Sequence, residues 1–115
     1  MESQRRFSMF ASDVERAAAL LSALANAKRL LVLCYLADAG EAPVARIADE
    51  VGLSQSALSQ HLAKLRADGL VATRRDSQLV FYRLQDPRVL MLLKLLRDMF
   101  CPELATLSRK GSDHD

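Results

Sequence analysis

The sequence has no hydrophobic run long enough to cross a membrane. A membrane-spanning helix needs ~18 consecutive apolar residues, whereas a run such as Val89 to Leu93 stops at Lys94. Residues 1–30 carry charged side chains throughout and contain no long apolar core, so we expect no secretory signal. These two absences predict a cytoplasmic protein that does not contact a membrane.

Cysteine is scarce, with only Cys34 and Cys101. Two cysteines without a secretory context argue against a fold stabilised by disulfide bonds. Their possible roles are therefore metal binding, redox chemistry or core packing. The sequence also lacks a Cys-x-x-Cys motif. That absence argues against a thiol oxidoreductase that would use both cysteines catalytically.

The chain is short and evenly composed. Its 115 residues, 50% of them hydrophobic, predict one globular domain over 1–115, with an ordered core at about 12–106 and flexible ends. No repeat, low-complexity stretch or linker divides it. A chain of this length has little room for a substrate cleft beside a core. We therefore expect no enzyme and no cofactor.

Capping residues and glycines predict four helices, a hairpin and a last helix. A capping box, Ser12-Asp13-Val14-Glu15, begins the first helix, and Asn26 and Ser54 cap the second and fourth. Pro43 begins the third, and Asp86 with Pro87 opens a last helix of about twenty residues. The predicted segments are helices at 12–24, 27–39, 43–51 and 55–68, with strands at 70–75 and 79–84 around Asp76-Ser77-Gln78. The predicted fold is mainly α with a β-hairpin wing, in the order α-α-α-α-β-β-α.

Residues 47–54, followed by a capped helix, have the spacing of a helix-turn-helix. Gly52 lies in the tight turn, where a positive φ is favoured. In the following helix Leu58, Leu62 and Leu65 form the stripe expected to be buried. The opposite face and the cap carry short polar or basic groups suited to base edges and phosphates, which we predict to bind DNA: Ser54, Gln55, Ser56, Ser59, Gln60, His61 and Lys64.

Basic residues gather in the same region. The whole chain has a net charge of +2, yet residues 54–83 alone hold five basic side chains and two acidic ones. The hairpin places Arg74, Arg75 and Gln78 near its tip, where a wing reaches phosphates or the minor groove. A phosphate backbone selects such a basic face, so the wing is predicted to bind DNA as well.

Several motifs resemble the ArsR family of winged-helix repressors, over roughly residues 15–103. They are Lys28-Arg29-Leu30-Leu31, the stretch from Gly52 to Leu62 that contains Ser59-Gln60-His61-Leu62, the stretch from Leu65 to Val71, and Phe81-Tyr82. The resemblance implies a homodimer that binds inverted repeats in promoters and leaves when an inducer arrives.

Metal ligands of the family are missing from their expected places. The family's Cys-x-Cys motif would fall near Pro43 to Asp49, where no cysteine stands, and the last helix has no histidine. The two histidines lie in the recognition helix, His61, and in the tail, His114. We expect no metal site, because such a site needs three or four converging ligands. A metal-responsive repressor stays an alternative.

The surroundings of the two cysteines resemble the dithiol branch of the family, of the BigR, SqrR and YgaV type. The matching stretches are Leu-Cys-Tyr-Leu at 33–36 and Phe-Cys-Pro at 100–102. By this resemblance, reactive sulfur species link Cys34 and Cys101 and the promoter is released. Inert core thiols are the alternative, because cysteine is often buried and reactivity needs a lowered pKa or partial exposure. Residues 51–76 also resemble the NolR type, which leaves open a repressor without a small inducer.

The last helix carries more apolar residues than one packing face needs. From Val89 to Phe100, nine of twelve residues are apolar, whereas a helix packed on one side needs only about three or four in seven. A two-fold partner would bury this surplus with its first helix, through Val14, Ala17, Ala18 and Leu21. We predict a homodimer formed by the first and last helices.

Together these features predict a cytoplasmic, homodimeric transcriptional repressor. It would bind double-stranded DNA at an inverted-repeat operator. Reactive sulfur species would act as the inducer through Cys34 and Cys101. The alternative hypothesis is a winged-helix module that binds other proteins and does not bind DNA. The polar face of the fourth helix and the arginines of the wing argue against that rival.

Overall fold

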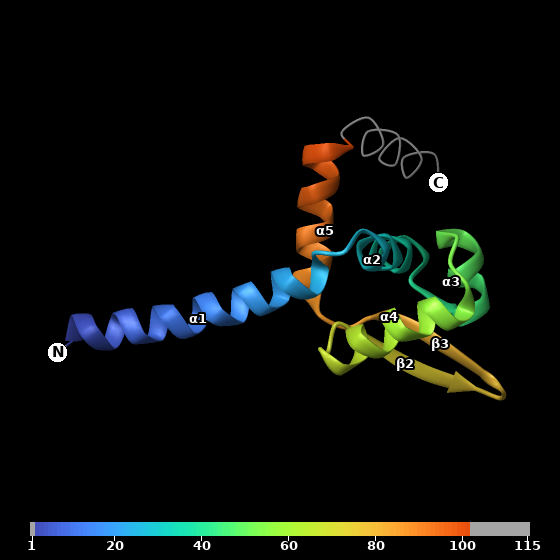
Figure 1. The fold of residues 1–115 in the computed structure, drawn as a ribbon, viewed down its shortest axis with the longest axis horizontal. Helices are drawn as coiled ribbons and strands as arrows, with labels where there is room; N and C mark the ends of the chain where they lie inside the picture. The colour runs from blue at the N-terminus through green and yellow to red at the C-terminus, as the bar shows by residue number, and fades with distance from the viewer. Residues whose placement is uncertain (1, 102–115) are drawn as a thin grey trace.

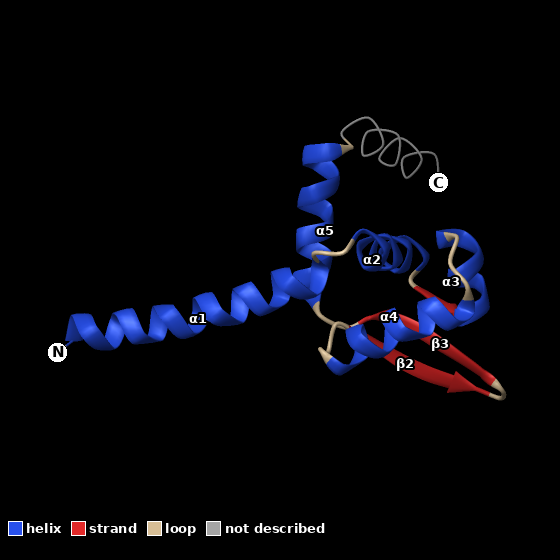
Figure 2. Cartoon of the chain, in the orientation of Figure 1, coloured by secondary structure: helices blue, strands red, loops and turns tan. Residues whose placement is uncertain are grey.

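The computed structural model describes residues 2–101, which form five helices and a three-stranded sheet (Figures 1 and 2). The elements in chain order are α1 (Glu2–Leu24), α2 (Ala27–Ala39), β1 (Glu41–Pro43), α3 (Val44–Val51), α4 (Gln55–Ala67), β2 (Val71–Asp76), β3 (Leu79–Leu84) and α5 (Pro87–Phe100). This order confirms the predicted fold class, with β1 as an addition.

Three of the predicted caps close the helix ends that the sequence assigned to them. The Asn26 side chain accepts hydrogen bonds from the backbone N–H groups of Lys28 and Arg29, both at 3.0 Å. Ser54 Oγ accepts from the N–H of Ala57 at 3.1 Å, and Asp86 accepts from that of Arg88 at 2.9 Å. Because these bonds satisfy backbone donors that lack a helical partner, they fix where α2, α4 and α5 begin.

The first and last helices differ from the prediction. α1 begins at Glu2, so Ser12 lies inside the helix and caps nothing. Residues 2–11 contain no glycine or proline to stop the helix, and it continues through the predicted cap. α5 has 14 residues, fewer than expected, because the backbone leaves the helical region at Cys101 (φ −134°, ψ 54°). The next residue in the sequence is a proline, which disfavours helical geometry in the residue before it. The predicted core between 102 and 106 lies outside the described residues.

The sheet has the strand order β1-β3-β2, and all its pairs are antiparallel. Glu41 of β1 lies opposite Arg83 of β3, and Arg74 of β2 lies opposite Phe81. β1 was not predicted, because three residues between a glycine and a helix carry no alternating pattern. This strand exists through its pairing with β3, which is far away in the chain.

The core lies where α2, α3 and α4 meet the sheet and the start of α5. Its largest fully buried side chains are Val32, Leu33, Leu36, Ile47, Leu58, Leu62, Leu65, Val71 and Val89. The three leucines of α4 confirm the predicted stripe. Because α4 is anchored along this stripe, its opposite face is held outward in a fixed orientation.

α1 projects away from the rest of the chain, and α5 stands across its C-terminal end (Figure 1). Both helices expose large apolar side chains, among them Phe7, Phe10, Val14 and Leu21 on α1 and Met91, Leu95, Met99 and Phe100 on α5. No single helix among residues 2–101 meets the length and hydropathy of a membrane span; α1 and α2 do so only when counted together across a 92° bend.

Candidate DNA-reading surface and cysteine site

The helices α3 and α4 form a helix-turn-helix. Gly52 ends α3 in the left-handed region, at φ 70° and ψ 39°, as predicted for the tight turn. The N–H of Leu53 donates to the carbonyl of Ala48 at 3.0 Å, and Ser54 then caps α4. The small side chain of Ala48 is buried with Leu58 and Leu62 in the same core. The turn thus sets the direction in which α4 leaves α3.

The cap and the outward face of α4 present the predicted polar residues to solvent. Ser54, Gln55, Ser56, Ser59, Gln60 and Lys64 are exposed, and His61 is partly buried. Lys64 also pairs with Asp68 one turn later, at 3.5 Å. The exposed groups are hydrogen-bond donors and acceptors that can approach base edges and phosphates. Their contacts with DNA stay a prediction.

The wing is a hairpin with a two-residue turn, Ser77-Gln78. Ser77 has a positive φ of 56°, which matches the twist that two-residue hairpin turns require. Arg75 and Gln78 are exposed at or beside this turn, so they can reach a neighbouring duplex.

Arg74, the other predicted wing residue, is engaged within the chain. Its Nε donates to Glu41 Oε2 at 3.2 Å, and its Nη2 donates to Glu41 Oε1. The guanidinium also lies over the Phe81 ring, 4.5 Å from the ring centroid. The hydrogen bond from Arg74 lowers the pKa of Glu41 below its usual range. Glu41 was not among the predicted residues, because its contact with Arg74 depends on the strand β1, which was not predicted.

The two cysteines line one hollow between α2 and α5. Its volume is about 400 Å³, and its lining residues are Leu30, Leu31, Cys34, Leu93, Leu96, Arg97, Phe100 and Cys101. Cys34 is partly buried and Cys101 is exposed, and both are free thiols. The structure therefore brings together two residues that are far apart in the sequence and were predicted to act as a pair.

The surroundings of Cys34 affect its reactivity in opposing directions. Burial raises the pKa of the Cys34 thiol, the Arg97 guanidinium lowers it, and Cys101 raises it; the net direction is upward. A raised pKa leaves less thiolate at neutral pH. Arg97 is a second residue that was not predicted, since its effect on Cys34 depends on how α5 faces α2.

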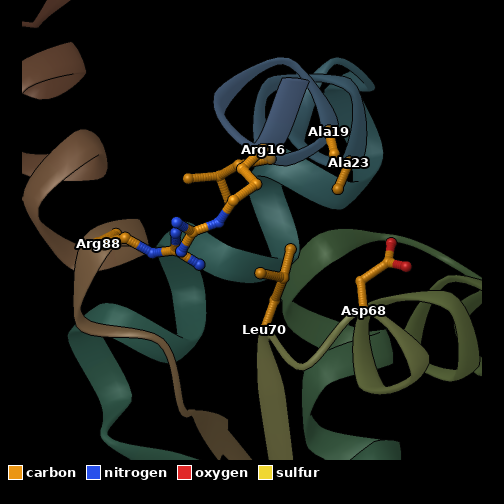
Figure 3. A pocket seen from close by; sticks show the side chains of 7 residues that line it. Arg16, Ala19, Ala23, Asp68, Leu70 and Arg88 are labelled. Carbon is orange, nitrogen blue, oxygen red and sulfur yellow. The ribbon is translucent and has the colours of Figure 1, made fainter. Parts of the chain in front are cut away.

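A second hollow, lined by Arg16, Arg88 and Asp68, lies where α1, α4 and α5 meet (Figure 3). Arg16 and Arg88 point toward one another in it. Each charged group already has an opposite partner: Arg16 lies 3.6 Å from Asp13, Arg88 is bonded to Asp86, and Asp68 pairs with a lysine. In the described part of the chain, no three His, Cys, Asp or Glu side chains are placed to hold a metal ion.

Comparisons with known proteins agree with this geometry. The profile described as "Bacterial regulatory protein, arsR family" matches residues 26–73. The nodulation protein NolR of Rhizobium meliloti is 49% identical over 85% of this chain and 80% of its own length. The solved structure of reduced HlyU from Vibrio cholerae superposes with a TM-score of 0.76 at 45% identity, over 81% of this chain and 97% of that one. The repressor BigR from Xylella fastidiosa gives a TM-score of 0.76 at 34% identity, over 82% and 95%.

Proposed function

The chain belongs to the ArsR family of bacterial DNA-binding transcriptional regulators, and on that premise we propose a homodimeric repressor that reactive sulfur species release from its operator. Cys34 and Cys101 are the switch in this proposal. The supporting observation is that both thiols line the same hollow, between α2 and the helix that carries the exposed apolar face.

DNA binding in this proposal uses α4 and the wing. The exposed amides of Gln55 and Gln60 pair with base edges in the major groove, as glutamine does with adenine. Ser54, Ser56, Ser59, His61 and Lys64 contact the backbone or neighbouring bases, and Arg75 and Gln78 reach phosphates or the minor groove. The protein works in the cytoplasm, where its operator lies.

The dimer in this proposal forms through α1 and α5. A hollow of about 440 Å³ between them is lined by Ala17, Leu20, Leu21, Met91, Leu92, Leu95 and Arg88. Large apolar side chains of both helices are exposed around this hollow, and contiguous exposed apolar surface marks protein–protein interfaces. A two-fold partner covers it and places two copies of α4 on successive half-sites, about one helical turn of DNA apart.

The switch consumes one persulfide, R–S–SH, for each disulfide formed. One cysteine thiolate attacks the outer sulfur of the persulfide, R–S⁻ leaves, and the cysteine becomes a persulfide. The other thiolate then attacks the inner sulfur of this persulfide, which is the cysteine's own Sγ, and HS⁻ leaves. The two thiols lose two electrons to the sulfane sulfur, which departs as hydrogen sulfide. If a second persulfide molecule first converts the other cysteine to a persulfide, with loss of R–S⁻, its terminal sulfur attacks the inner sulfur of the first, HS⁻ leaves, and the bridge contains three sulfur atoms.

Linking the thiols changes DNA affinity through α5. A disulfide requires Cα atoms about 4.4–6.8 Å apart, so the bridge fixes the end of α5 against α2. Since α5 also forms the proposed dimer interface, a shift of this helix changes the spacing of the two α4 helices. Half-site spacing on DNA is fixed, and affinity for the whole operator falls. Such couplings are usually about 5–150-fold in affinity.

The experiment treats the protein with an organic persulfide and measures mass and DNA binding on the same sample. The probe is a duplex that the wild-type protein selects from a random-sequence pool. We expect a linked Cys34–Cys101 pair and released DNA for the wild type, while Cys34→Ser and Cys101→Ser keep DNA binding and lose the response. A serine variant that still releases DNA on treatment contradicts the proposal.

A second candidate is a repressor with inert cysteines and no small inducer. The partial burial of Cys34 and its raised pKa favour it, because both slow the attack of the thiol on sulfur donors. In this case the treated wild type keeps its mass and its affinity for DNA. The same measurement therefore separates the two candidates.

A further inference from the structure

One ion pair crosses the whole sheet on its outer face. Glu41 belongs to one edge strand, β1, and Arg74 to the other, β2, with β3 between them. The Arg74 guanidinium passes over the Phe81 ring of β3 and reaches both carboxylate oxygens of Glu41. The three strands are thus joined by side chains as well as by their backbones.

The pair connects the wing to the helix-turn-helix. Glu41 comes directly after Gly40, which closes α2, and β1 leads at once into α3. Arg74 lies toward the outer part of the hairpin, three residues before Ser77 in the turn. A bond between them therefore restrains the angle of the wing relative to α3 and, through the tight turn, relative to α4.

Arg74 and Arg75 are not equivalent, because successive residues of a strand point to opposite faces. Arg74 shares its face with Phe81, its partner in the register, and turns toward Glu41. Arg75 lies on the opposite face of β2 and is exposed. Both side chains are exposed, but an arginine that gives two donors to a carboxylate and covers an aromatic ring has less freedom to bind a phosphate than one without these contacts.

We propose that Glu41 is a positioning residue for DNA binding, which holds the wing in place through Arg74. In this proposal Arg75 is the arginine of the wing that contacts a DNA phosphate. This inference rests on the proposed use of the wing in DNA binding. It assigns to an acidic residue a favourable effect on binding a polyanion. Electrostatics alone gives the opposite sign, since removal of a nearby carboxylate strengthens attraction to phosphate.

The experiment compares Glu41→Gln, Arg74→Gln and Arg75→Gln on a duplex selected by the wild-type protein, over a series of salt concentrations. We expect Glu41→Gln to weaken binding, by roughly two- to fivefold, as for the loss of a half-exposed ion pair. The salt dependence of log K keeps its slope in Glu41→Gln and in Arg74→Gln, because no phosphate contact is lost. In Arg75→Gln the magnitude of the slope falls by about 0.9.

The exchanged variant, Glu41→Arg with Arg74→Glu, keeps the net charge and rebuilds the pair in reverse. Affinity close to wild type in this variant supports the positioning role. Glu50→Gln, which neutralises an exposed carboxylate of α3 outside the sheet, is the matched charge control, and circular dichroism confirms that each variant is folded.

Two results overturn the inference: tighter binding by Glu41→Gln, or a slope that falls by about 0.9 in Arg74→Gln. A slope that falls in Arg74→Gln makes Arg74 a phosphate ligand, whereas tighter binding by Glu41→Gln means that the charge of Glu41 opposes DNA binding and that the residue does not position the wing. Wild-type protein that selects no duplex refutes the proposed function instead, so the two failures are distinguishable.

Discussion

Substitutions of Ser54, the cap of α4, are expected to change the free energy of unfolding and the affinity for DNA in different directions. Ser54 Oγ accepts one hydrogen bond from the N–H of Ala57, and the side chain is otherwise exposed. Ser54→Ala removes this bond and costs about 1 kcal/mol of unfolding free energy. Ser54→Asn and Ser54→Asp keep a side-chain oxygen at the same place. The aspartate also adds about 0.3–1 kcal/mol of stability, since its charge lies at the positive end of the helix dipole.

The effect of Ser54→Asp on DNA binding has the opposite sign. If the start of α4 faces the duplex, the new carboxylate lies about 5 Å from a phosphate. At an effective dielectric constant between 80 and 20, the repulsion is about 1–3 kcal/mol, or roughly 5–150-fold in affinity. Ser54→Asn has nearly the same shape without the charge, so it is the matched control and binds within a few fold of wild type.

Urea denaturation measures the stability of the three variants, and a fluorescence-anisotropy titration measures their affinity at one fixed salt concentration. The expected pattern is an Asp variant at least as stable as the Asn variant and much weaker on DNA. Equal affinity of the Asp and Asn variants would refute the orientation of α4 that we infer, because its N-terminus would then lie away from phosphate.

Three further predictions concern the core, the dimer and pH. Leu62→Ala, at a fully buried position of α4, should cost about 2–5 kcal/mol in urea denaturation; a loss below 1 kcal/mol would contradict the burial. Leu95→Glu, at a residue of α5 that is 54% exposed, should leave the monomer folded and abolish the proposed dimer in analytical ultracentrifugation. A variant that sediments as the wild-type dimer would exclude Leu95 from the interface. The hydrogen bond from Arg88 lowers the pKa of Asp86, so its stabilising effect is full above the ordinary aspartate pKa of about 3.9 and is lost as pH falls through the lower, folded-state pKa. Stability measured between pH 7 and 3 should therefore fall less in Asp86→Asn than in the wild type, and parallel curves would exclude this contribution.

The sequence predicted the elements whose limits depend on neighbouring residues. Three helices are capped through hydrogen bonds to backbone groups two or three residues away, by Asn26, Ser54 and Asp86. Because these contacts are local, the neighbouring residues were enough to predict them. The stripe of Leu58 and Leu62 also follows from helical periodicity alone. The same local signals placed the polar face of α4 on the exposed side.

What the sequence did not predict depends on contacts between distant residues. β1 becomes a strand by pairing with β3, and Glu41 meets Arg74 across 33 positions. The raised pKa of Cys34 arises from packing of α2 against α5. The predicted start of α1 was wrong for a different reason. A capping box at Ser12 does not begin a helix when the preceding residues also favour a helix.

The strand order β1-β3-β2 leaves two open sheet edges, and open edges recruit strands from other molecules. β1 limits this hazard by its length of three residues and by Pro43, which has no N–H to donate. β2 is longer, and its outer half is Arg74-Arg75-Asp76. These charges therefore protect the free edge against aggregation, in addition to the DNA contact that we propose for Arg75. Full neutralisation of the wing would produce a protein that binds DNA poorly and also precipitates through edge-to-edge pairing.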